Sequence, residues 1–94
     1  MDDSDTRAEA RLQIVNELGM HARAATKFVQ TANKFKSNLT VEKDGQAVNG
    51  KSIMGVLMLV AAKGTFIQVA CEGPDAPQAL AVITKLVQDK FGEE

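Results

Sequence analysis

The sequence predicts a small α+β domain, an open-faced β-sandwich in which a four-stranded antiparallel sheet carries three helices on one face. Short runs of alternating apolar and polar residues predict the strands, because alternation is typical of a half-buried strand. Stretches with apolar residues three or four apart separate these runs, as expected of helices that cover a sheet. The 94 residues suit one domain, since compact domains typically hold about 50–200 residues.

The predicted elements follow one another in the order β-α-β-β-α-β-α. Residues 1–9 are polar and without periodicity, so we expect a flexible N-terminal tail followed by a single domain over residues 10–94. Leu12 and Ile14 indicate the first strand, and the helical spacing of apolar residues over 22–35 indicates the first helix. Asp44-Gly45 predicts a hairpin, because glycine tolerates the positive φ of a tight turn.

The second half of the chain contains signals of the same kinds for two more helices and a strand. Ser52 is a natural N-cap for a short helix over 53–60. Alternation over 67–72 predicts the fourth strand, and Asp75 should cap a third helix whose apolar stripe covers 79–87. Together these elements complete the α+β fold.

Composition excludes several classes of protein. The formal net charge of −1 and the absence of Trp and Tyr argue against a nucleic-acid binder. No apolar run approaches the roughly 20 residues of a membrane span, and no signal peptide is evident. Cys71 is the only cysteine, so we expect no disulfide, and no Cys/His cluster indicates a metal site. We also expect no cofactor and, without a signal peptide or a membrane span, a cytoplasmic location. The charged residues 85–94 are expected to be solvated.

His21, the only histidine of the chain, lies at or just before the start of the first predicted helix. A lone histidine is more often a capping or surface residue than a reactive group. Its surroundings favour chemistry, because the first turn of a helix has unpaired N–H groups that attract anions. Arg23 follows with a planar donor fork suited to phosphate oxygens. A neutral imidazole is also a nucleophile near pH 7. Spacing alone does not separate a phosphoryl acceptor from an anion-binding site.

Two motifs resemble one known family. Residues 19–26, GMHARAAT, resemble the active-site signature of the histidine-containing phosphocarrier (HPr) family of the phosphoenolpyruvate-dependent phosphotransferase system. Residues 51–55, KSIMG, resemble the second signature of the family, around a serine that is regulatory in some members. The resemblance extends from about residue 10 to residue 91.

The resemblance implies a mechanism. His21 would accept a phosphoryl group on Nδ1 from phosphorylated enzyme I and pass it to a histidine of an enzyme IIA component. Arg23 and the backbone N–H groups of Ala22 and Arg23 would hold the phosphate oxygens. The protein would be a monomeric carrier without independent turnover. Ser52 would cap its helix and also be the target of an HPr kinase/phosphorylase.

The motifs divide between two branches of the family. Residues 16–21, NELGMH, and 72–74, EGP, are closer to the nitrogen-related branch, whereas KSIMG is closer to the sugar-system carrier. Leu18 stands where some sugar-transport members have a polar residue, and Ala24 stands where many members have proline. The alternative function is therefore a regulatory interaction module, docking through the second helix, rather than a component of sugar uptake.

The second predicted helix is apolar almost all round, although a helix on one face of a sheet buries only one stripe. The rest of its surface is expected to dock partner proteins, since exposed apolar patches usually mark interaction sites. Burial under a loop is the alternative. The predicted docking residues, including a basic rim, are Met20, Lys27, Lys51, Ile53, Met54 and Met58.

Overall fold

The structure, a computed structural model, describes residues 6–93. Its four strands form one antiparallel sheet in the order β1-β4-β2-β3. The strands are β1 (Arg7–Gln13), β2 (Asn38–Lys43), β3 (Gln46–Asn49) and β4 (Phe66–Glu72). β4 is thus paired with the first strand of the chain on one side and with β2 of the β2–β3 hairpin on the other.

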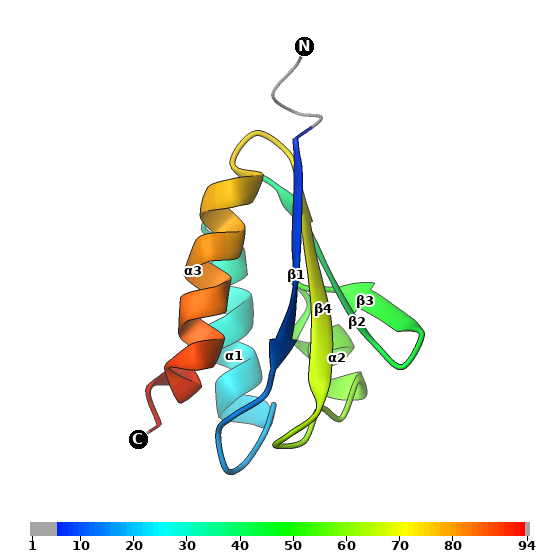
Figure 1. The fold of residues 1–94 in the computed structure, drawn as a ribbon, viewed down its shortest axis with the longest axis vertical. Coiled ribbons are helices and arrows are strands. Elements are labelled where there is room, and N and C mark those ends of the chain that lie inside the picture. Colours follow the sequence, from blue (N-terminus) through cyan, green and yellow to red (C-terminus); the bar gives the residue numbers. More distant parts are fainter. Residues whose placement is uncertain (1–5, 94) are drawn as a thin grey trace.

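Three α-helices accompany the sheet, namely α1 (Ala22–Ala32), α2 (Ile53–Met58) and α3 (Ala76–Gln88). Helices α1 and α3 lie side by side along one face of the sheet (Figure 1). The shorter α2 packs against α1 and β3, and a 3-10 turn, η2 (Lys90–Gly92), follows α3. The predicted open-faced α+β sandwich and its element order are confirmed.

Burial alternates along the strands, as their sequence pattern predicts. On β4, Ile67, Val69 and Cys71 are buried, whereas the residues between them are partly exposed. These side chains meet the apolar stripe of α1, in which Phe28 is fully buried. The opposite face of the sheet is open, and there the Arg11 guanidinium lies 4.1 Å from the centre of the Phe66 ring.

The first strand begins earlier than the sequence predicts. Arg7 pairs with Glu72 and Glu9 pairs with Ala70, so residues 7–9 belong to the sheet rather than to a flexible tail. Ala8, between Arg7 and Glu9, packs against the core, but an alternation of three residues is too short to predict a strand, and pairing with β4 identifies this segment. Thr6 also lies beside the end of β4, because its carbonyl accepts the Gly73 N–H at 2.9 Å, and residues 1–5 of the predicted tail lie outside the described residues.

Local signals at turns and helix starts are largely confirmed. Asp44 and Gly45 have φ values of 52° and 85°, as the predicted hairpin turn requires. The Ser52 hydroxyl accepts the Gly55 N–H at 3.1 Å and caps α2. This helix ends at Met58, two residues before its predicted end.

The prediction that Asp75 caps its helix with its side chain is wrong. Asp75 stands at the N-cap of α3, yet its carboxylate makes no capping bond. It accepts instead the N–H groups of Lys36 and Ser37, each at 2.9 Å, and the Ser37 hydroxyl at 2.5 Å. The carboxylate therefore ties the start of α3 to the segment before β2.

Two features are absent from residues 6–93. None of the helices found there combines the length and the apolar character needed to cross a membrane. No three His, Cys, Asp or Glu side chains of that part of the chain are grouped so that they could hold a metal ion.

Candidate functional site

A tight loop between β1 and α1 presents His21. Gly19 adopts a φ of 67°, and its N–H donates to the Asn16 carbonyl at 3.1 Å. The Met20 N–H donates to the Ala61 carbonyl at 2.8 Å, which ties the loop to the segment after α2. A Cβ on Gly19 would lie 2.6 Å from that same carbonyl oxygen. Gly19 therefore permits a close turn before His21, and a side chain at this position would strain it.

His21 is the N-cap of α1, where the sequence predicts it. Its backbone is extended, with φ −77° and ψ −178°, and its carbonyl accepts the Ala25 N–H at 2.8 Å. The ring nitrogen Nδ1 accepts the Arg23 N–H at 3.3 Å. A neutral imidazole that accepts at one nitrogen carries its proton on the other. The Nδ1 lone pair therefore points at the positive end of an 11-residue helix.

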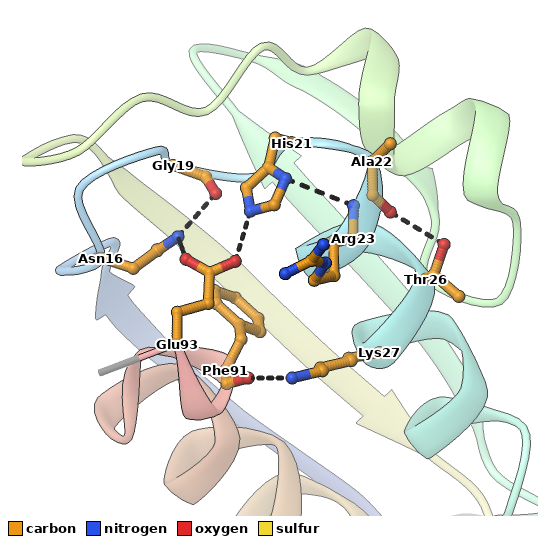
Figure 2. A network of polar contacts seen from close by, with 9 residues as sticks. All are labelled: Asn16, Gly19, His21, Ala22, Arg23, Thr26, Lys27, Phe91 and Glu93. Carbon is orange, nitrogen blue, oxygen red and sulfur yellow. Dashed lines mark hydrogen bonds and ion pairs between the residues drawn. The ribbon is translucent and has the colours of Figure 1, made fainter.

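The opposite ring nitrogen, Nε2, contacts a carboxylate oxygen of Glu93 (Figure 2). The other oxygen of that carboxylate accepts a hydrogen bond from Nδ2 of Asn16 at 2.9 Å, and Nδ2 also donates to the Gly19 carbonyl at 2.7 Å. Asn16 is fully buried. Hydrogen bonds hold the pKa of Glu93 below its ordinary value of 4.5, the bond from the Asn16 amide having the larger effect and that from the His21 ring the next. Glu93 is therefore ionised at neutral pH.

An unusual left-handed turn brings Glu93 to the imidazole. Lys90, Phe91 and Gly92 have φ values of 59°, 57° and 74°, which costs a residue with a side chain roughly 1–2 kcal/mol. Burial of the Phe91 ring, which is 1% exposed, offsets this cost, since a buried phenylalanine contributes about 1.5–3 kcal/mol. The Lys27 ammonium also donates to the Phe91 carbonyl at 2.7 Å. Residues 90–93 are thus fixed against the first turns of α1.

A shallow hollow of about 660 Å³ lies beside the imidazole. It is lined by the loop, the start of α1 and the end of the chain, including Leu18, Arg23 and Glu93. The His21 side chain is 28% exposed, so a partner can reach it. The Arg23 side chain makes no ion pair within residues 6–93, and Figure 2 draws its guanidinium on the same side of α1 as His21 and Glu93. The hollow could therefore hold an anion between the helix end and this guanidinium.

Two residues of the site are absent from the sequence-based prediction. Glu93 lies in the charged tail that the sequence predicts to be solvated, whereas the carboxylate of this residue is only 14% exposed. Asn16 gives no signal of its own, because polar residues in a loop are ordinarily exposed. The buried neighbour Phe91 is the one clue in the sequence, since a large apolar residue within a charged tail indicates packing.

The predicted docking residues fall into two groups. Ile53, Met54 and Met58 are 40%, 70% and 61% exposed, as expected of an unpartnered face of α2. Met20 is 6% exposed and belongs to the core. Its assignment to the docking surface is wrong, because its side chain packs in the core cluster and leaves little surface for a partner.

The two lysines of the predicted basic rim lie in different places. Lys27 is in the middle of α1 and lines the hollow beside His21, whereas Lys51 donates to the carbonyl of Phe35, just beyond the C-terminal end of α1, at 2.7 Å. Eight residues separate Lys27 from Phe35, which corresponds to about 12 Å at a helical rise of about 1.5 Å per residue. Only Lys27 adds positive charge next to the imidazole.

Comparison with known proteins agrees with this geometry. Residues 8–89 match the family model described as "PTS HPr component phosphorylation site". The chain is 51% identical over 82 residues to the phosphocarrier protein HPr of Neisseria meningitidis serogroup A, covering 87% of this chain and 92% of that protein. The HPr of Xylella fastidiosa strain Temecula1 is 45% identical over 86 residues, with 92% and 97% covered.

The chain belongs to the HPr family. Solved HPr structures share its fold. A crystal structure from Thermoanaerobacter tengcongensis has a TM-score of 0.90 at 45% identity, with 93% of this chain and 98% of that chain covered. An HPr dimer from the same organism has a TM-score of 0.75 at 45% identity, with 87% and 94% covered. The protein is thus a phosphocarrier of the phosphotransferase system, whose members work with partners such as enzyme I and enzyme IIA.

Proposed function

We propose that His21 is the residue that carries the phosphoryl group, accepting it on Nδ1 from phosphorylated enzyme I and passing it to a histidine of an enzyme IIA component. The observation that carries the proposal is the contact of Nδ1 with the Arg23 N–H at 3.3 Å. It aims the lone pair of a neutral imidazole at a helix N-terminus, where negative charge is stabilised. We locate this exchange in the cytoplasm.

The transfer needs little chemistry from the protein. The Nδ1 lone pair forms a new P–N bond, while the P–N bond to the donor histidine breaks and returns its electron pair to the donor nitrogen. The Arg23 N–H, whose 3.3 Å contact is long for a hydrogen bond, is well placed to shift to a phosphate oxygen, joined by the N–H of Ala22. The Arg23 guanidinium supplies a further charge-assisted donor. Positioning and charge stabilisation are the usual means of phosphoryl transfer.

Labelling tests the carrier role directly. The protein is incubated with enzyme I and ³²P-labelled phosphoenolpyruvate. We expect about one acid-labile phosphoryl group per chain, abolished by His21→Ala and formed more slowly by Arg23→Ala. Each chain should be labelled only once until an enzyme IIA is added, because a carrier has no turnover of its own. An unlabelled wild-type protein would favour the regulatory interaction module instead.

The exposed face of α2 is proposed to dock enzyme I and enzyme IIA. Ile53, Met54 and Met58 carry it, and methionine side chains adapt to more than one partner. Lys51, directly before α2, and Lys27, beside the hollow at His21, would contribute positive charge. Met54→Asp should weaken enzyme I binding in calorimetry while leaving the melting temperature nearly unchanged. Unchanged affinity would contradict this assignment.

Ser52 is proposed as a second phosphorylation site, used by an HPr kinase/phosphorylase. Its hydroxyl caps α2, and a phosphate at a helix N-terminus is electrostatically favourable. The added charge would lie on the docking face and would oppose an acidic partner surface. Incubation with the kinase and ATP, followed by mass spectrometry, tests the proposal, and an unmodified Ser52 would contradict it.

The protein is proposed to act as a monomer. A single α2 face must serve two successive partners, and a dimer that covered this face would block both. Sedimentation at micromolar concentration should give the 10.1 kDa of one chain, and a species of twice that mass would contradict the proposal.

A further inference from the structure

The contact of Glu93 with His21 is unexplained by the carrier role alone. A phosphoryl group adds up to two negative charges, and a carboxylate beside the acceptor would oppose them. The structure nevertheless fixes this carboxylate against the ring, using a buried asparagine, a buried phenylalanine and a left-handed turn. Such an arrangement favours a role for the carboxylate at Nε2, the ring nitrogen opposite the proposed phosphoryl acceptor Nδ1.

We infer that Glu93 is a positioning residue for phosphoryl transfer, whose carboxylate accepts the Nε2 proton of His21 and thereby keeps Nδ1 unprotonated and aimed at the start of α1. This inference deepens the proposed function and rests on it. Its support is geometric. The Arg23 N–H can donate to Nδ1, and a carboxylate can accept from Nε2, only if the proton is on Nε2.

The same contact assists the transfer step. When the Nδ1 lone pair becomes the bond to phosphorus, the proton remains on Nε2 and the ring gains positive charge. A carboxylate at Nε2 balances this charge, as an aspartate does for a catalytic histidine elsewhere. It lies across the ring from the phosphoryl group, so attraction to the nearby ring exceeds repulsion by the more distant phosphate.

The other charged groups around the ring do not duplicate this role. Arg23 and Lys27, both from α1, are cations. Glu17, from the loop, is paired with Lys63 at 2.5 Å. Within residues 6–93, Glu93 provides the carboxylate that touches the imidazole.

Asn16 makes the position selective for a carboxylate. Its amide nitrogen donates both to the Gly19 carbonyl at 2.7 Å and to Glu93 at 2.9 Å. Residue 93 must therefore present an acceptor to Asn16 and a second acceptor to Nε2. A carboxylate has two acceptor oxygens, whereas glutamine has one oxygen and one donor group. In Glu93→Gln, an oxygen facing Asn16 leaves the NH₂ group facing His21, which favours the wrong tautomer.

The experiment combines nitrogen NMR with transfer kinetics. Because His21 is the only histidine, long-range ¹H–¹⁵N spectra of the imidazole report its tautomer without ambiguity. They are recorded at pH 8 for the wild type, Glu93→Gln, Glu93→Ala and the control Glu42→Gln, which removes an exposed carboxylate on β2 outside the hollow. Rates of phosphorylation by enzyme I are measured for the same four proteins, with circular dichroism to check folding.

We expect the wild type and Glu42→Gln to hold the proton on Nε2 and to react at equal rates. Glu93→Gln and Glu93→Ala should show a larger fraction of the Nδ1–H tautomer and react about tenfold more slowly, a smaller loss than at a fully buried triad because this site is partly exposed. Identical tautomer populations and rates in all four proteins would overturn the inference. If instead the tautomer shifts but no protein is labelled, the carrier assignment of His21 fails while the contact of Glu93 with the ring stands.

Discussion

Replacing Gly19 by alanine should both destabilise the fold and displace His21. Two costs add up at this position. The φ of 67° costs an L-residue with a side chain roughly 1–2 kcal/mol. The new Cβ would also lie 2.6 Å from the Ala61 carbonyl oxygen, closer than such atoms approach. Relief requires the loop to move away from that carbonyl, which lengthens the 2.8 Å hydrogen bond from Met20 at a further cost of about 1 kcal/mol.

The total is about 2–3 kcal/mol of unfolding free energy, which corresponds to a fall in melting temperature of about 10–20 °C for a domain of this size. Gly45→Ala is the matched control. Gly45 has a φ of 85°, and a Cβ on it would have no other atom within 4 Å, so alanine there incurs the backbone cost without the collision. The control should lose only about 1–2 kcal/mol, and phosphorylation of His21 should continue at the wild-type rate.

Urea unfolding followed by far-ultraviolet circular dichroism gives both free energies, since the chain has no Trp or Tyr for a fluorescence assay. The rate of labelling by enzyme I gives the functional effect. We expect this rate to be at least tenfold lower in Gly19→Ala, because small misplacements of a reacting group slow its reaction strongly. Equal losses of stability in the two variants would refute the argument that the close approach to Ala61 matters. A wild-type labelling rate in Gly19→Ala would refute the claim that the loop positions His21.

Three further changes test other parts of the structure. The hydrogen bond from Ser37 is the largest of the effects that lower the pKa of Asp75 from 3.8 to about 2. The stability that the ionised carboxylate adds to the fold is therefore complete above pH 3.8 and is lost as the pH falls through the pKa of Asp75 in the folded protein. Asp75→Asn should remove this part of the acid dependence of urea midpoints, and an unchanged dependence would contradict the assignment. Phe91→Ala should lose about 3–5 kcal/mol in urea unfolding and raise the Nδ1–H fraction of His21 in NMR, whereas a loss below about 1 kcal/mol would mean that the ring is not packed as described. Ser52→Ala should lose about 1 kcal/mol in the same assay, and a slower labelling of His21 would show that this cap does more than stabilise α2.

The predictable parts of the molecule depend on neighbours in the sequence. The hairpin follows from Asp44 and Gly45, since few residue pairs accept positive φ at successive positions. Ser52 caps α2 because its side chain bonds an N–H three residues away. The place of His21 at a helix start follows from the helical spacing of apolar residues after it, whose buried stripe begins at Ala24. Each of these signals comes from residues only a few positions apart in the sequence.

The parts that sequence reasoning misses depend on contacts between distant segments. Glu93 meets His21 across 72 residues, and Asp75 meets Ser37 across 38. In both cases a local interpretation exists, as a solvated charge and as a helix cap, and tertiary contacts replace it. Met20 escapes prediction for the same reason, because its burial depends on the segment after α2 rather than on its own neighbours.

The fixed position of residues 90–93 has a practical consequence for how the protein should be handled. Glu93 lies against the imidazole, so an affinity tag or reporter joined shortly after it would emerge beside the proposed phosphoryl acceptor. Strand β1 runs from Arg7 toward the His21 loop over 7 residues, so its beginning lies about 20 Å away, at the other end of the sheet (Figure 1). Fusions therefore belong at the N-terminus, and transfer rates measured on C-terminally tagged protein would partly describe the tag.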